Sequence, residues 1–180
     1  MFKSDIASLI HFKNVAHGSP VLYLDFDGVL HPDEVYSTKH GIILRAPGHQ
    51  LFEGAVILES ILAPYPNIKI VLSTSWVIVK GYSYAREHLP PSLSSRVIGA
   101  TFHKRLMDRW GFLQLTRGQQ IASDVNRRSA GEWLALDDDD EGWPPQYSDR
   151  LVRCDSHLGL MCPNTQRNLA QMIQERFSNK

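Results

Sequence analysis

Short runs of apolar residues recur along the chain, and each is followed by polar residues. The clearest runs cover residues 21–24, 68–72 and 133–136, and weaker ones cover residues 96–99 and 151–154. Continuous apolar runs of this length are typical of strands that are buried on both faces of a parallel sheet. The pattern therefore predicts a buried parallel sheet.

Segments with helical spacing of apolar residues lie between these runs, at residues 52–62, 82–89, 117–127 and 164–177. Thr116 and Gln119 are spaced as a capping box at the start of the third segment. Strands that alternate with helices indicate an α/β fold, a Rossmann-like three-layer sandwich around a central parallel sheet.

The remaining segments are short. Residues 4–12 could form an N-terminal helix capped by Ser4, and the irregular stretch 33–49 contains a predicted hairpin with Gly41 at its turn. A chain of 180 residues is long enough for one domain with a sizeable core. We expect a single domain over residues 1–180, with residues 1–19 as an N-terminal extension and residues 21–177 as the core.

Composition excludes several classes of protein. Lys+Arg equals Asp+Glu, so no overall basic field indicates nucleic acid as a partner. Cys154 and Cys162 are too few for a disulfide framework and indicate free thiols. No apolar stretch reaches the length of a membrane span, and the polar interruptions in residues 1–19 make a poor signal peptide. We therefore expect a cytoplasmic protein.

The strand at residues 21–24 is followed directly by Asp25 and, two positions on, by Asp27. Ligands of open α/β sheets bind beyond the carboxyl ends of the strands. If the chain stays extended, both side chains point to one side. Clustered carboxylates repel each other unless a hard cation lies between them, and Mg²⁺ is the simplest such cation.

Other predicted strands also end in reactive groups. Ser73 follows the second strand, Asp137 and Asp138 follow the fourth, and Arg117 begins a helix between these two strands. Carboxylates, a hydroxyl group and a cation along one edge of a sheet are the groups that phosphoryl transfer requires. Each group also has an ordinary structural interpretation, namely a turn pair, a strand-end hydroxyl, a surface arginine or an acidic loop.

The segment Asp25-Phe26-Asp27-Gly28-Val29-Leu30 resembles the first motif of the haloacid dehalogenase (HAD) superfamily, whose members are mostly Mg²⁺-dependent phosphatases. Residues 70–73 resemble its second motif, and residues 134–138 resemble its fourth motif in the double-aspartate form. No large cap domain fits between these motifs, so the chain resembles a minimally capped, HAD-like member.

The resemblance implies a role for each matching residue. Asp25 would be the nucleophile and a metal ligand, and Asp27 would be the general acid and base and would bind Mg²⁺ through its backbone carbonyl. Ser73 would hydrogen-bond the phosphoryl group, with Thr74 as an adjacent rival. Arg117 would stabilise the phosphoryl charge.

Two of these assignments have rivals. Lys104 or Arg105 could replace Arg117 as the cation of the third motif. Asp138 is the expected metal ligand with Asp137 as its support, although their adjacency leaves the two exchangeable.

Gly28, Thr74, Trp76 and Arg45 are our candidates for contacts with the substrate, although Trp76 could equally pack against the sheet. The resemblance implies an open site of the kind that acts on phosphate groups of macromolecules. The same motifs also resemble HAD domains of bacterial RNA-repair proteins. His31, His40 and His49 match no standard zinc spacing and are interpreted as loop residues.

Three functions are consistent with the sequence. The first is a Mg²⁺-dependent phosphatase that hydrolyses a phosphate monoester through an aspartyl-phosphate intermediate. The second is a phosphatase that uses the same chemistry on polynucleotide ends in nucleic-acid repair. The third is a non-catalytic module that binds a phosphate group or a partner. The sequence names neither the physiological substrate nor the oligomeric state.

Overall fold

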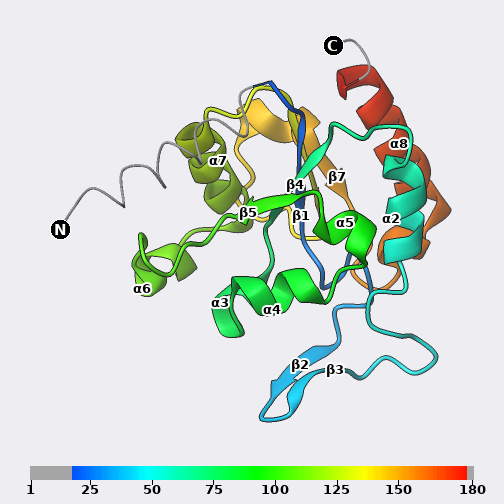
Figure 1. Cartoon of the computed structure of the whole chain (residues 1–180), viewed down its shortest axis with the longest axis vertical. Coiled ribbons are helices and arrows are strands. Elements are labelled where there is room, and N and C mark those ends of the chain that lie inside the picture. Colours follow the sequence, from blue (N-terminus) through cyan, green and yellow to red (C-terminus); the bar gives the residue numbers. More distant parts are fainter. Residues whose placement is uncertain (1–17, 178–180) are drawn as a thin grey trace.

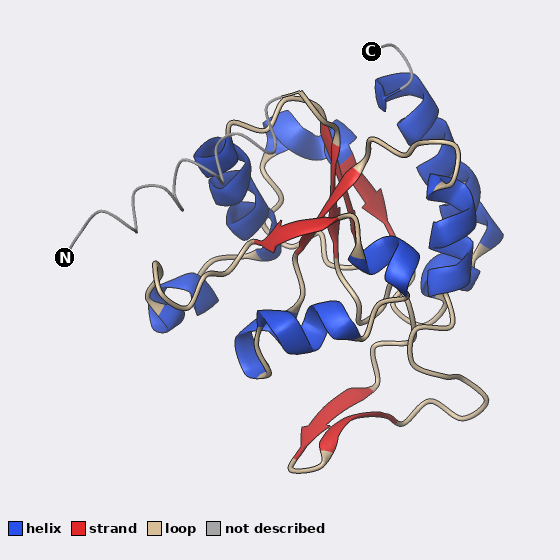
Figure 2. Cartoon of the chain, viewed as in Figure 1, coloured by secondary structure: helices blue, strands red, loops and turns tan. Residues whose placement is uncertain are grey.

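The structure, a computed structural model, describes residues 18–177, and its centre is a five-stranded parallel sheet with the strand order β5-β4-β1-β6-β7. The strands of this sheet are β1 (Val21–Leu24), β4 (Lys69–Leu72), β5 (Val97–Ala100), β6 (Trp133–Asp137) and β7 (Leu151–Arg153). The predicted α/β sandwich around a parallel sheet is confirmed (Figures 1 and 2).

Helices cover both faces of this sheet. On the right of Figure 1 lie α2 and α8, and α7 lies on the left. The helices of the described residues are α2 (Ala55–Leu62), α3 (Ser75–Val79), α4 (Tyr82–Glu87), α5 (Pro91–Ser94), α6 (Arg109–Leu113), α7 (Arg117–Arg128) and α8 (Pro163–Phe177), with 3₁₀ turns η1 (Pro145–Arg150) and η2 (Gly159–Met161).

Alternate residues of β1 enter two separate cores. Leu22 and Leu24 pack in the larger core with residues of α2 and α8. Val21 and Tyr23 point the other way and pack in a smaller core with residues of α7. Successive side chains of a strand face opposite sides of the sheet, so a strand covered on both faces must be apolar throughout, as β1 is.

The β1–β4 connection carries a hairpin in addition to α2. Its strands, β2 (Val35–Thr38) and β3 (Gly41–Leu44), pair antiparallel and extend beyond the carboxyl end of β1 at the bottom of Figure 1. Within residues 18–177 neither this connection nor the one from β4 to α7 contains a separate cap domain, as predicted.

Three short helices and one helix boundary differ from the predictions. The sequence did not predict α3, α5 or α6. The start of α2 is at Ala55 rather than at residue 52, because Phe52 has a left-handed backbone (φ 62°) that no helix accommodates. The helix predicted at residues 4–12 lies outside the described residues.

Among the residues that the structure describes, no helix combines the length and the apolar character needed to cross a membrane.

Candidate functional site

The side chain of Asp25 lies at the carboxyl end of the central strand and is 3% exposed. The chain keeps its strand hydrogen bonding to this point, because the Asp25 amide donates to the carbonyl of Leu136 (3.1 Å). One carboxylate oxygen of Asp25 accepts from the amide of Phe26 (2.7 Å) and the other from Arg117 Nη2 (2.8 Å). The orientation of this carboxylate is therefore fixed from two sides.

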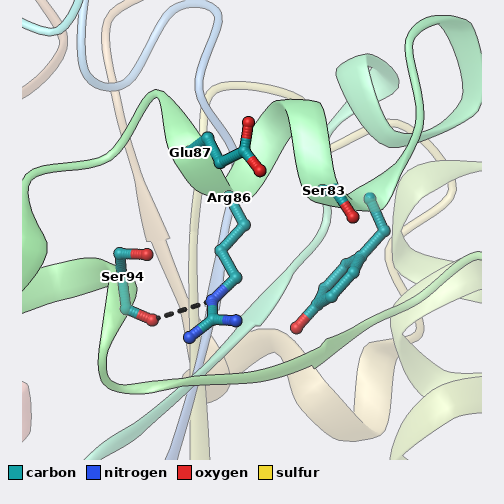
Figure 3. Close-up of a pocket in the computed structure, with 5 residues that line it drawn as sticks. Ser83, Arg86, Glu87 and Ser94 are labelled. Atoms are coloured by element: carbon teal, nitrogen blue, oxygen red, sulfur yellow. Dashed lines mark hydrogen bonds between the residues drawn. The ribbon is translucent and has the colours of Figure 1, made fainter.

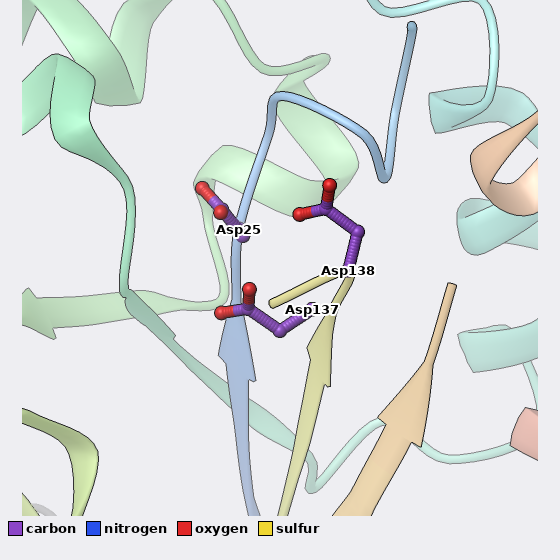
Figure 4. Close-up of side chains that lie close together, drawn as sticks. All are labelled: Asp25, Asp137 and Asp138. Atoms are coloured by element: carbon purple, nitrogen blue, oxygen red, sulfur yellow. The ribbon is translucent and has the colours of Figure 1, made fainter. Parts of the chain in front are cut away.

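Asp137 and Asp138, at the end of β6, complete a group of three carboxylates with Asp25 (Figure 4). One oxygen from each residue lies within 4.8 Å of the others, and Asp25 and Asp137 are buried. Buried carboxylates at this separation need a compensating cation. The all-oxygen donor set fits a hard divalent ion such as Mg²⁺.

Burial raises the pKa of each carboxyl in this group. It raises the pKa of Asp25 well above its usual range, although Arg117 opposes the shift. Burial also raises the pKa of Asp137 to about 7 against the same guanidinium, and the pKa of Asp138 to about 6 with help from the charge of Asp33. A single arginine is therefore too little positive charge to hold all three carboxylates ionised.

Arg117 is the first residue of α7, and the capping box of Thr116 and Gln119 fixes the start of that helix. Its guanidinium bonds the Asp25 carboxylate and the carbonyl of Ser73, and its Nε lies 3.2 Å from Asp137 Oδ2. The carboxylates raise the pKa of Arg117 further above its already high value, against the effect of burial. The side chain therefore stays charged.

The two rivals of Arg117 lie elsewhere. Lys104 and Arg105 are exposed residues of the β5–α6 connection, and within residues 18–177 neither contacts a carboxylate of the group. Arg117 is therefore the cation that the structure brings to Asp25.

The hydroxyl oxygen of Ser73 is buried and has no hydrogen-bond partner among the described residues. The Ser73 amide donates to the carbonyl of Leu24 (2.8 Å), which places Ser73 beside Asp25 at the same edge of the sheet. A buried hydroxyl without a partner is costly unless a ligand supplies one. By contrast, the Thr74 hydroxyl accepts from the amide of Trp76 (3.3 Å) and caps α3.

Asp27 does not join the group of three carboxylates. Its Oδ1 accepts from Trp76 Nε1 (2.8 Å) and from His31 Nε2 (3.2 Å), and its Oδ2 accepts from Ser75 Oγ (3.3 Å). The two aspartates of the first motif therefore face different partners rather than sharing one side, because β1 ends at Leu24 and Asp27 lies beyond the regular strand.

His31 is buried, and its contacts fix which ring nitrogen carries the proton. Its Nδ1 accepts from the amide of Phe52 (3.2 Å), so Nε2 is the nitrogen that donates to Asp27. The rings of His31, Phe52 and Trp76 pack edge to face or tilted with centroids 5.0–5.9 Å apart. This aromatic group holds the donors of Asp27 in place.

The structure places three of the predicted substrate contacts, namely Trp76, Gly28 and Arg45, in different settings. Trp76 is 1% exposed, so it does not reach a leaving group; its place in the first turn of α3 turns it inward onto Asp27. Gly28 has φ +70°, and a Cβ there would overlap the carboxylate of Asp138. Arg45 is exposed beside the hairpin, with its guanidinium 4.8 Å from the ring centre of Tyr36.

Sequence reasoning missed His31, Phe52 and Ser75 as partners of this site. His31 lies four residues after Asp27, and this short separation is the only signal in the sequence that the two side chains are in contact. Phe52 carried no such signal, because its contact depends on a left-handed backbone.

A separate hollow lies between α4 and α5 (Figure 3). Its lining is Tyr82, Ser83, Arg86, Glu87 and Ser94, and Arg86 Nε donates to the carbonyl of Ser94 (3.1 Å). None of the site residues described above lines it.

The chain matches the model of a known protein family. The family described as "HAD domain in Swiss Army Knife RNA repair proteins" matches residues 21–165. This range holds every one of the site residues described above. No curated protein and no solved structure matches the chain.

Proposed function

Because the chain belongs to the family of HAD domains in Swiss Army Knife RNA repair proteins, we propose that it hydrolyses a phosphate monoester and that Asp25 is the nucleophile. One observation carries this proposal. Asp25 is buried at the end of the central strand, beside the guanidinium of Arg117 and the unpartnered hydroxyl of Ser73. A nucleophile, a cation and a free donor converge there, as phosphoryl transfer requires.

In the first step a carboxylate oxygen of Asp25 attacks phosphorus, and the bond from phosphorus to the leaving oxygen breaks. Arg117 stabilises the charge on the phosphoryl oxygens, and the Ser73 hydroxyl donates to one of them. Asp27, in its protonated form, gives its proton to the leaving oxygen. The products of this step are an alcohol and an acyl phosphate on Asp25.

In the second step water attacks the phosphorus of that acyl phosphate. The Asp27 carboxylate takes a proton from the water, and the bond between phosphorus and the Asp25 oxygen breaks. Inorganic phosphate leaves, Asp25 is again a carboxylate, and Asp27 is again protonated. Each residue ends the cycle in the state in which it began.

Mg²⁺ is the cofactor that we propose for this site, held by Asp25, Asp138 and the backbone carbonyl of Asp27, with Asp137 in support. The carboxylate group fits it, because the donors are all oxygens and because burial raises the pKa of Asp137 and Asp138 even with Arg117 beside them. When bound, Mg²⁺ would neutralise phosphoryl oxygens and so lower the barrier to attack. Without the ion, Arg117 would be the cation among the described residues that faces the dianionic phosphate, with the Ser73 hydroxyl as a neutral donor.

The phosphorylated end of a nucleic-acid strand is the substrate that we favour over a small molecule. Two observations support this choice: the description of the matching family, and the lack of a cap domain over the site within the described residues. A long strand can enter such a site without a lid having to close around it.

We propose a cytoplasmic location, which the free thiols of Cys154 and Cys162 support.

Hydrolysis of an aryl phosphate tests the chemistry. We expect turnover in Mg²⁺, loss of turnover in EDTA, and a drop of roughly 10³-fold or more in Asp25→Asn. The matched control is Asp149→Asn, which changes an exposed aspartate just before the start of β7, at the opposite edge of the sheet. Equal turnover in Asp25→Asn and the control would contradict the proposal.

A second comparison separates the substrates. For a nucleic-acid substrate, we expect a higher kcat/KM on oligonucleotides with a 3′- or 5′-phosphate than on the aryl phosphate. An oligonucleotide rate no better than the aryl phosphate rate would favour a small substrate. No Mg²⁺-dependent hydrolysis of either would favour a non-catalytic module.

A further inference from the structure

The connection from β5 to α7 presents an exposed tryptophan. Trp110, in α6, is 74% exposed, whereas Trp76 and Trp133 are buried at 1% and 3%. Leu106 is also exposed, at 63%. Aromatic residues, tryptophan among them, are enriched at binding interfaces relative to the rest of a protein surface.

Three basic residues lie close to this tryptophan in the sequence. Lys104, Arg105 and Arg109 are all exposed. In the described part of the chain, Arg105 and Arg109 are the arginines without a hydrogen bond, an ion pair or a ring contact. We call Lys104, Arg105, Leu106, Arg109 and Trp110 the α6 surface.

Acidic side chains are few in this connection. Asp108 is the one carboxylate between residues 101 and 116, and it is engaged, since its side chain accepts from the amide of Gly111 (2.5 Å) and caps α6. Arg127 and Arg128, which could have joined a basic patch, are instead paired with Asp124. Arg105 and Arg109, the two arginines without a partner among the described residues, therefore both lie on the α6 surface.

The α6 surface is carried on an anchored segment. The rings of Phe102 and Phe112 pack with centroids 5.1 Å apart, and both are buried. The side chain of Gln120, in α7, donates to the carbonyls of Phe112 (3.3 Å) and Leu115 (3.0 Å). The exposed residues are thus held on a supported scaffold, which lowers the cost of ordering them on binding.

The connection starts and ends at the edge of the sheet that carries the candidate active site. It begins at Thr101, beyond the carboxyl end of β5, and leads into Arg117 (Figure 1). In the strand order, β5 lies two places from β1, which corresponds to about 10 Å at the usual spacing of strands. A strand whose end reached Asp25 could therefore continue along this edge.

We propose that the α6 surface binds the single-stranded nucleic acid that leads to the phosphorylated end. A base stacks on Trp110, and Arg105 and Arg109 pair with phosphates, since exposed aromatic and basic groups together form the usual platform for single strands. The statement that this strand is a substrate rests on the proposed function. The statement that the α6 surface binds nucleic acid does not. The unpaired positive charge favours a polyanion over an apolar protein partner.

Binding of a 3′-phosphorylated single-stranded RNA oligomer, measured by fluorescence anisotropy at several salt concentrations, tests this proposal. Trp110→Ala should weaken affinity about fivefold or more. Arg105→Ala with Arg109→Ala should lower the slope of log affinity against log salt by about 1.4, because each phosphate that is no longer neutralised removes about 0.7. The wild-type intrinsic fluorescence should also be quenched by the RNA, because Trp110 is the most exposed indole among the described residues.

Matched controls keep the result specific. Arg167→Ala removes an exposed arginine from α8, and Val56→Ala removes a side chain of α2 that is 66% exposed. Neither should change affinity. Hydrolysis of the aryl phosphate should stay within about twofold of wild type in every variant, because none of these residues lies at Asp25; each comparison is made on folded protein checked by circular dichroism.

The outcomes separate this proposal from the proposed function. Weaker RNA binding in the α6 variants supports the surface even if no hydrolysis is found in any sample. Affinity and salt slope unchanged in both variants would overturn the surface and leave the chemistry at Asp25 untouched. Self-association that Trp110→Ala abolishes, with RNA affinity unchanged, would assign the surface to a second copy of the chain and also overturn the proposal.

Discussion

Three donors surround the carboxylate of Asp27, and each comes from a different kind of side chain: the indole of Trp76, the imidazole of His31 and the hydroxyl of Ser75. Since Asp27 is our proposed acid and base, these residues act on the reaction through its position. They are positioning residues, and substitutions there should affect proton transfer more than phosphate binding.

Trp76→Phe tests the positioning role of these residues. The variant keeps an aromatic ring beside Phe26 and Phe52 but removes the Nε1 donor that lies 2.8 Å from Asp27. We expect kcat on an alkyl phosphate, whose leaving group needs a proton, to fall about tenfold or more, with a smaller effect on an aryl phosphate and on KM.

The control for that variant is Trp133→Phe, which makes the same substitution in the smaller core. Equal losses on both phosphates in Trp76→Phe would indicate a general disturbance of the site rather than a misplaced acid. That result would contradict the positioning role.

Asp138→Asn tests the charge balance of the three carboxylates. Burial raises the pKa of Asp138 to about 6 in the folded protein, above the usual 3.8. Without a metal, the folded state therefore loses stability relative to the unfolded state as pH rises from about 4 to 6, and this loss persists above 6. In EDTA, the variant should melt at a higher temperature than wild type at pH 8 and at a similar temperature at pH 4.

Mg²⁺ should reverse that order at pH 8. The wild type has the Asp138 carboxylate as a ligand for the ion and the variant lacks it, so the ion stabilises the folded wild type more. Thermal melts at both pH values, in EDTA and in Mg²⁺, measure the effect. A variant that melts at or below wild type at pH 8 in EDTA would contradict the predicted repulsion.

Residues differ in how far the sequence could place them. Asp25, Ser73 and Asp137 end apolar runs, so the rule that parallel strands end at one edge predicts their proximity. His31 and Phe52 could not be placed this way, since their contacts depend on the turn after Asp27 and on a left-handed backbone at Phe52. Their partners come from tertiary packing and leave no spacing to detect.

Among the elements, the start of α7 has a clear physical link to the site. The Thr116 hydroxyl accepts from the amide of Gln119, and the Gln119 side chain accepts from the Thr116 amide (3.0 Å). The residue that follows Thr116 is Arg117. The cap therefore fixes the first turn that carries the guanidinium to Asp25.

Thr116→Ala should lower the free energy of unfolding by about 1 kcal/mol, the usual value of an N-cap. It should also lower kcat/KM, since the N-cap would no longer fix the first turn of α7, which carries Arg117. Urea denaturation and steady-state kinetics measure the two effects, with Thr116→Ser as the control that keeps the hydroxyl. Unchanged stability in the alanine variant would show that packing, rather than the cap, sets this helix start.

Elements with a signal in the sequence could be predicted, whereas the one-turn helices could not. The strands and α7 have repeated apolar spacing or a capping box, whereas α3, α5 and α6 are one-turn helices set by local caps and packing. Pro91, two residues after the helix predicted at residues 82–89, starts α5, as its fixed φ allows at a first helical position.

At the scale of the whole molecule, the sheet brings distant segments to one edge. Asp25, Ser73, Arg117 and Asp138 are spread over more than 110 residues of sequence, and the parallel strands bring them together. The extent of the domain, with residues 21–177 as the core, stays a prediction. One cooperative unfolding transition, seen alike by circular dichroism and tryptophan fluorescence, would agree with it.

The central claim is that Asp25 carries the phosphoryl group during turnover, and trapping that intermediate tests it most directly. The protein is mixed with an aryl phosphate in Mg²⁺, quenched in acid, reduced with borohydride and analysed by peptide mass spectrometry. We predict that the peptide containing Asp25 carries homoserine at that position, the product of reducing an acyl phosphate, and that Asp25→Asn yields none. Turnover without modification of Asp25, or with the phosphoryl group on another residue, would contradict the account.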